Sequence, residues 1–134
     1  MSAERTATYI DSSAIVKLAV VEPESKALRR YLVRRQPLVS SALARTEVAR
    51  ALMPSGPVAV ARGEDVLRRI QLLRVNDRVL VEAGRMEPAE LRPLDAIHLA
   101  SAGQLGSAVK RIVTYDERMA DAARASGWSV ASPS

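Results

Sequence analysis

The chain of 134 residues contains no cysteine, no phenylalanine and a single histidine, His98. The absence of cysteine excludes disulfides, thiolate nucleophiles and cysteine-ligated zinc. A single histidine excludes a histidine acid–base pair and a metal site built from several histidines. With three tyrosines and one tryptophan, the chain cannot easily present the row of aromatic rings on which single-stranded nucleic acid stacks. Any RNA binding is therefore expected to use phosphates and shape.

Long apolar runs are also absent. The most apolar early stretch, residues 14–21, contains Lys17 and is far too short to span a membrane. The first residues lack the apolar segment of a signal peptide. We therefore expect a cytoplasmic protein that does not engage membranes.

Positive charge is in moderate excess, with 20 lysines and arginines against 15 acids and a net charge of +5. This balance favours an anionic partner. Only three of the cations are lysines, and the planar fork of arginine suits phosphate. A GC-rich genome would explain the arginine content equally well. No basic block stands out, so a basic surface would have to be assembled by folding.

Short β-prone runs alternate with helical patterns along the whole chain. Strands are expected at 8–10, 38–40, 73–75, 111–115 and 128–130, and helices at 13–20, 23–36, 42–53, 58–74, 77–86, 94–104 and 116–126. Ser41 and Asp77 are expected to cap two of these helices. The alternation predicts one α/β domain over residues 1–134, with a central parallel sheet of four to five strands and helices on both faces.

Two acids directly follow predicted strands. Asp11 comes after the first strand and Asp116 after the fourth. Ligands of open parallel sheets bind beyond the carboxyl ends of the strands, so both side chains are expected at that edge. Either acid alone is better explained as a helix cap or a partner of the helix dipole.

Two further acids lie on predicted helices. Glu47 is on a face of small and apolar residues, which is unusual without a partner; the alternative is a surface side chain paired with Arg50 or Arg45. Asp95 opens an otherwise almost wholly apolar helix, which suggests that it faces a cleft, although compensation of the helix dipole would also explain it. On the same helix, we expect His98 to be a satisfied buried histidine rather than a catalytic one.

Together these four carboxylates form a set that could converge at one edge of the sheet. Clustered carboxylates repel one another and raise each other's pKa, and a hard divalent cation relieves that repulsion. With one histidine and no cysteine, an oxygen-ligated Mg²⁺ or Mn²⁺ is the metal that the composition supports.

Four segments around these acids resemble, in order, the motifs of PIN-domain ribonucleases. They are residues 8–14 (TYIDSSA), 41–52 (SALARTEVARAL), 93–102 (PLDAIHLASA) and 113–119 (VTYDERM). Each motif alone is weakly specific, but the ordered set spans nearly the whole chain. The length is similar to that of VapC toxins of type II toxin–antitoxin pairs.

The resemblance implies a Mg²⁺-dependent endoribonuclease toxin that hydrolyses RNA phosphodiester bonds with a metal-activated water. It also implies inhibition by a cognate VapB-like antitoxin, and a homodimer. It carries over Asp11, Glu47, Asp95 and Asp116 as the acidic quartet, with Mg²⁺, or Mn²⁺ as a substitute, held by Asp11, Asp95 and Asp116. The supporting hydroxyls are Ser13 and Thr114, Asp121 is an alternative acid one turn beyond Asp116, and Arg45, Arg50 and Arg92 are candidates for contacts with RNA phosphates.

Other functions fit less well. A phosphatase of the haloacid dehalogenase type needs a second aspartate two residues after the first, where this chain has Ser13. The six glycines form no phosphate-binding or dinucleotide-binding motif. The main alternative is a catalytically weak PIN-like module that binds RNA or protein and acts through a partner.

Overall fold

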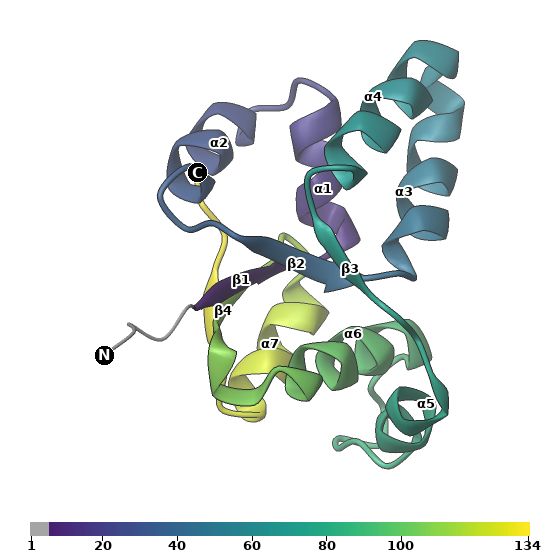
Figure 1. The fold of residues 1–134 in the computed structure, drawn as a ribbon, viewed down its shortest axis with the longest axis vertical. Helices are drawn as coiled ribbons and strands as arrows, with labels where there is room; N and C mark the ends of the chain where they lie inside the picture. Colours follow the sequence, from purple (N-terminus) through teal and green to yellow (C-terminus); the bar gives the residue numbers. More distant parts are fainter. Residues whose placement is uncertain (1–5) are drawn as a thin grey trace.

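A parallel sheet of five strands forms the centre of the molecule (Figure 1). The structure, a computed structural model, describes residues 6–134. The strand order is β3-β2-β1-β4-β5. The strands are β1 (Ala7–Ile10), β2 (Leu38–Ser41), β3 (Gln71–Leu73), β4 (Val109–Val113) and β5 (Ser129–Ala131). Every neighbouring pair is parallel, which confirms the predicted sheet.

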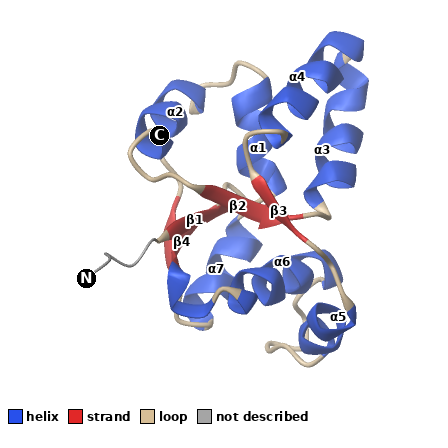
Figure 2. Ribbon diagram, viewed as in Figure 1, coloured by secondary structure: helices blue, strands red, loops and turns tan. Residues whose placement is uncertain are grey.

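Helices cover both faces of the sheet, as predicted (Figures 1 and 2). One face carries α1 (Ser12–Ala19), α2 (Ser25–Leu32), α3 (Ala44–Leu52) and α4 (Pro57–Leu67). The other carries α5 (Asp77–Gly84), α6 (Pro93–Gln104) and α7 (Glu117–Ala125). Short 3₁₀ turns lie at Met53–Ser55 and Gly106–Ala108. None of the helices described over residues 6–134 has the length and apolarity that a membrane crossing requires.

The two faces of the sheet bury two separate apolar cores. Successive strand side chains point to opposite faces, so Ile10 and Val113 pack with the α1–α4 layer while Tyr9 and Ile112 pack with α6 and α7. All four residues of β1 are buried, because it lies in the middle of the sheet. The residues just after β1 and β4 are thereby held on a rigid base.

One glycine brings α3 and α4 into close contact. A Cβ atom at Gly63 would lie 2.6 Å from Cδ1 of Leu52 and 3.0 Å from Cγ1 of Val48. Glycine at this position therefore lets the two helices approach more closely than any larger residue would. The same contact sets the position of α3, which carries Glu47.

Several predicted boundaries are wrong by a few residues. Ser41 does not cap α3; it ends β2, its hydroxyl accepts a hydrogen bond from the Leu43 amide, and the helix begins at Ala44. Helix α4 ends at Leu67 rather than near residue 74, because 71–73 pair with β2 as β3. The side chain that caps α5 is Asn76 and not Asp77. These differences arise from tertiary pairing and local turns that override helix propensity.

Candidate active site

All four predicted acids line one cavity of about 460 Å³. Asp11 directly follows β1, and Asp116 lies in the loop after β4. These two strands are neighbours in the sheet. Glu47 reaches the cavity from α3 and Asp95 from the first turn of α6. The carboxyl edge of the sheet therefore gathers the quartet, as strand order and motif spacing predict.

Asp11 is the most buried of the four, with 5% of its surface exposed. It caps α1 and accepts hydrogen bonds from Ser13 Oγ at 2.6 Å, Thr114 Oγ1 at 2.5 Å and the Ala14 amide at 3.2 Å. Burial raises the pKa of Asp11 despite the opposing effect of the Ser13 and Thr114 hydrogen bonds. Both predicted supporting hydroxyls therefore contact Asp11 directly.

The same hydroxyls connect Asp11 to the loop that carries Asp116. The Tyr115 amide donates to Ser13 Oγ at 2.9 Å, and the Asp116 amide donates to Thr114 Oγ1 at 3.1 Å. Each hydroxyl thus accepts from the loop backbone and donates to Asp11. This pattern fixes the spacing between the ends of β1 and β4.

Asp95 and Asp116 are bridged by one cation. Arg92 donates from Nε to Asp95 Oδ2 at 2.9 Å and from Nη2 to Asp116 Oδ2 at 2.7 Å. Asp116 also caps α7 through the Arg118 and Met119 amides. Partial burial raises the pKa of Asp116, but the Arg92 hydrogen bond and these amides outweigh it, so the pKa lies below its usual value.

The site therefore has two parts. We call Asp11 and Glu47 the inner acids, because hydroxyls, an amide and an imidazole hold them, and Asp95 and Asp116 the outer acids, because an arginine holds them. Of the three arginines predicted to contact RNA, only Arg92 lines the cavity. Arg45 and Arg50 are exposed on α3, outside the cavity lining.

Glu47 pairs with the only histidine of the chain. Its Oε1 lies 2.6 Å from His98 Nε2, and His98 Nδ1 lies 2.7 Å from the Tyr9 hydroxyl. His98 is 2% exposed and both ring nitrogens have partners, so it is the satisfied buried histidine that was predicted. The alternative in which Glu47 pairs with Arg50 or Arg45 is wrong.

Sequence reasoning missed the contact between His98 and Glu47. The available signal was that His98 lies three residues after Asp95, on the same side of α6. Residues spaced by three on a helix share a face. A histidine beside a cavity-facing aspartate is therefore expected near the same cavity, although the spacing does not say which acid it meets.

The donor set fits a hard divalent cation by chemistry. Carboxylates and hydroxyls line the cavity, and Mg²⁺ prefers oxygen ligands. Within residues 6–134, no three aspartate, glutamate or histidine side chains lie grouped as a ready metal site. The hydrogen bonds explain this, because Arg92 holds the outer acids and His98 holds Glu47. Binding of an ion would require the outer acids to exchange Arg92 for it.

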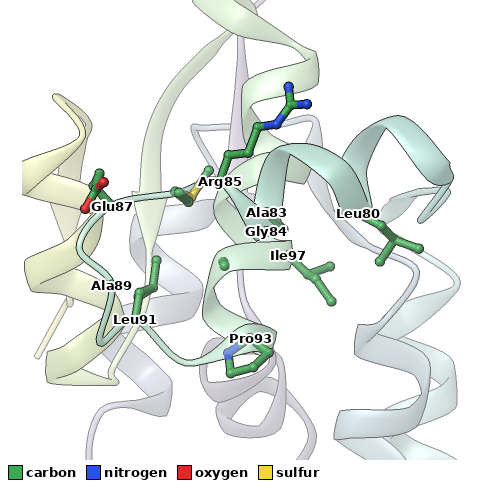
Figure 3. Close-up of a pocket in the computed structure, with 11 residues that line it drawn as sticks. Leu80, Ala83, Gly84, Arg85, Glu87, Ala89, Leu91, Pro93 and Ile97 are labelled. Carbon is green, nitrogen blue, oxygen red and sulfur yellow. The ribbon is translucent and has the colours of Figure 1, made fainter.

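A larger cavity lies next to the site, between α5 and α6 (Figure 3). Its volume is about 530 Å³, and mostly apolar side chains such as Leu80, Leu91 and Ile97 line it. The two charged residues of its lining, Arg85 and Glu87, do not pair with each other. None of the four acids takes part, so the chemistry points to the smaller cavity.

Comparison with known proteins agrees with these observations. Residues 8–125 match the family model of the PIN domain. The chain is 59% identical over 128 residues to ribonuclease VapC46 of Mycobacterium tuberculosis, covering 96% of this chain and 98% of that protein. It is 36% identical over 130 residues to ribonuclease VapC47 of the same species, covering 93% and 96%. A toxin–antitoxin complex from Klebsiella pneumoniae shares the fold, with a TM-score of 0.72 at 18% identity and coverage of 96% of this chain and 98% of that chain.

Proposed function

The chain belongs to the PIN domain family and, within it, to the VapC ribonucleases, and from this premise we propose that it is a Mg²⁺-dependent endoribonuclease and the toxin of a toxin–antitoxin pair. One observation carries the proposal. Four carboxylates from four separate segments line a single cavity at the carboxyl edge of the sheet. Such a set serves poorly for stability, because like charges repel, and serves well for holding a divalent cation.

Asp11, Asp95 and Asp116 would hold the ion, with Mn²⁺ able to substitute for Mg²⁺. A divalent cation there would supply positive charge that activates a water and stabilises charge at the scissile phosphate. Asp11 is already positioned by three hydrogen bonds. Glu47 uses Oε1 for His98, so Oε2 is the atom that would take the proton from the attacking water.

Arg92 would change partners during this reaction. In the structure it neutralises the outer acids. With a divalent cation held by these acids, the guanidinium would be free to contact an RNA phosphate, for which its planar fork is suited. Exposed Arg45 and Arg50 on α3 are proposed to contact the RNA backbone beyond the cavity.

The proposed partner is a cognate VapB-like antitoxin. The related fold in the Klebsiella pneumoniae toxin–antitoxin complex supports this, and so does the affinity of the outer acids for a guanidinium. An arginine of the antitoxin would occupy the outer acids as Arg92 does and exclude the ion. A homodimer and a cytoplasmic location stay predictions from the resemblance.

Cleavage of RNA by the purified protein in Mg²⁺ or Mn²⁺ tests the catalytic role. Asp11→Asn preserves the shape of the side chain and removes its charge, and it should lower the cleavage rate about 100-fold or more. The matched control is Asp65→Asn, which removes an exposed carboxylate on α4 that pairs with Arg68. Equal cleavage by the two variants would show that the acidic quartet is not the active site.

Calorimetry with Mn²⁺ separates an enzyme from a catalytically weak module. An enzyme of this type binds the ion and loses the binding in the Asp11→Asn variant. A module with a degenerate site shows no Mn²⁺ binding that depends on the acidic quartet. In that case Asp11→Asn also leaves its association with a partner unchanged. Mapping of RNA ends in cells after induction, against an Asp95→Asn control, would then identify the target RNA.

A further inference from the structure

A buried chain of hydrogen bonds leads from the sheet to the active-site cavity. Tyr9 is fully buried in β1, and its hydroxyl lies 2.7 Å from His98 Nδ1 on α6. His98 Nε2 lies 2.6 Å from Glu47 Oε1, which belongs to the cavity lining. The tyrosine and histidine rings meet edge to face, with an interplanar angle of 83°. The geometry therefore leaves both rings little freedom to turn.

The donor at the active-site end of this hydrogen-bonded series follows from Glu47. A carboxylate oxygen accepts hydrogen bonds, so His98 donates from Nε2 to Glu47 Oε1. The other ring nitrogen, Nδ1, bonds the Tyr9 hydroxyl, which can donate or accept. Both ring nitrogens of His98 are thereby held.

We propose that Tyr9 and His98 are positioning residues that hold Glu47 Oε1 and thereby direct Glu47 Oε2 into the cavity. This inference rests on the proposed function for its catalytic meaning. A glutamate has three rotatable bonds, and ordering its side chain costs conformational free energy. The histidine offsets that cost and holds the carboxylate away from the exposed Arg50 on the same helix.

In the sequence, Tyr9 and His98 each lie close to a further acid of the site. Tyr9 precedes Asp11 by two residues, and His98 follows Asp95 by three. Any shift of β1 or α6 that moves these acids therefore also moves the donor to Glu47. The hydrogen bonds of Tyr9, His98 and Glu47 therefore couple three of the four motifs.

Because His98 is the only histidine, its ring nitrogens give a single set of signals in a histidine-labelled sample. Long-range ¹H–¹⁵N NMR of the metal-free protein should show a proton on Nε2, the atom that faces Glu47. Tyr9→Phe should shift the Nδ1 resonance because it removes the hydrogen-bond partner and keeps the ring. An unprotonated Nε2 in the wild-type protein would overturn the proposal.

Kinetics then distinguish positioning from simple packing. Outer partners of this kind are worth about 10- to 100-fold in activity, so His98→Leu should lower kcat by that factor with little change in KM. His98→Gln, which can still donate toward Glu47, should recover most of the loss. Tyr9→Phe should lower kcat severalfold, whereas Tyr31→Phe should not, because the Tyr31 hydroxyl contacts Arg111 outside the site.

The proposal is overturned if Tyr9→Phe and the Tyr31→Phe control have the same kcat and the same His98 NMR spectrum. Should His98→Leu fail to fold, the Tyr9→Phe comparison and the wild-type spectrum still decide it. Absence of cleavage by the wild-type protein would instead count against the proposed function. The NMR result does not depend on that outcome.

Discussion

The inner and outer acids of one cavity are held by opposite kinds of partner. Asp11 and Glu47 accept hydrogen bonds from hydroxyls, an amide and an imidazole. Asp95 and Asp116 share a guanidinium that is itself half-exposed. Hydroxyl and amide donors carry no charge and can stay in place beside a metal ion, whereas a guanidinium competes with the ion for the carboxylates. The inner acids are therefore preorganised, and the outer acids form the exchangeable part of the site.

The largest expected effect is stabilisation by the proposed ion. Manganese at 100 times its dissociation constant should raise the free energy of unfolding by about 2.7 kcal/mol, because it binds only the folded state. Thermal and urea unfolding with and without Mn²⁺ measure this change. The stabilisation should vanish in Asp11→Asn and persist in Asp65→Asn. An unchanged shift in Asp11→Asn would remove Asp11 from the metal site.

The next effect is a difference of sign between Asp11 and Asp116 in metal-free protein. Burial raises the pKa of Asp11 above 3.8, so its charge destabilises the fold at neutral pH. Asp11→Asn should therefore raise the free energy of unfolding, by about 1 kcal/mol. Asp116→Asn should lower it, by a few tenths to about 1 kcal/mol once solvent screening of this partly exposed pair is included.

The pH dependence provides the check on those signs. For Asp11, the folded state binds its proton more tightly than the unfolded state, so stability from this group falls as the pH rises from 3.8 through its raised pKa. For Asp116, the stabilisation that its charge provides is complete above pH 3.8 and is lost as the pH falls through the lowered pKa. Urea unfolding in EDTA should show both differences at pH 7 and smaller ones near pH 3. Two changes of the same sign would contradict the division into inner and outer acids.

Removal of Arg92 should affect metal and RNA in opposite directions. Arg92→Ala takes the competing cation from the outer acids and should tighten Mn²⁺ binding by up to about fivefold, since the ion no longer has to displace an exposed guanidinium. The same variant should raise KM for RNA, because a phosphate contact is lost. Calorimetry and cleavage kinetics measure the two effects. Arg118→Ala is the matched control, since the Arg118 side chain is exposed nearby on α7 and does not pair with the outer acids. Weaker Mn²⁺ binding in Arg92→Ala alone would refute competition between Arg92 and the ion.

The layout of the fold and the gathering of the acids could be predicted from the sequence. Asp11 and Asp116 follow β-prone runs, and parallel strands bring their carboxyl ends to one edge. That reasoning needs only the order of the elements. It is therefore insensitive to errors of a few residues, such as the early end of α4 or the start of α3 at Ala44.

The partners of the acids could not be predicted in the same way. Glu47 and His98 are 51 residues apart, and Arg92 reaches Asp116 across 24 residues. Local spacing instead favoured Arg50 and Arg45 for Glu47. The partner of Glu47 depends on how α6 packs against the sheet, because this packing brings His98 beside both Tyr9 and Glu47. Tertiary contacts of this kind leave no periodic signal in the sequence.

The smallest expected effect concerns Asp121, the alternative acid one turn beyond Asp116. Its side chain is 81% exposed and lies 3.6 Å from Arg124 on the same helix, and it is absent from the lining of the active-site cavity. Asp121→Asn should change the free energy of unfolding by less than about 0.5 kcal/mol and leave Mn²⁺ affinity unchanged. Calorimetry beside Asp116→Asn makes the comparison direct, since one variant removes the carboxylate that caps α7 and the other removes a carboxylate within the helix. A loss of affinity in Asp121→Asn equal to that in Asp116→Asn would extend the outer acids to a third member and place the ion closer to α7 than the Arg92 bridge indicates.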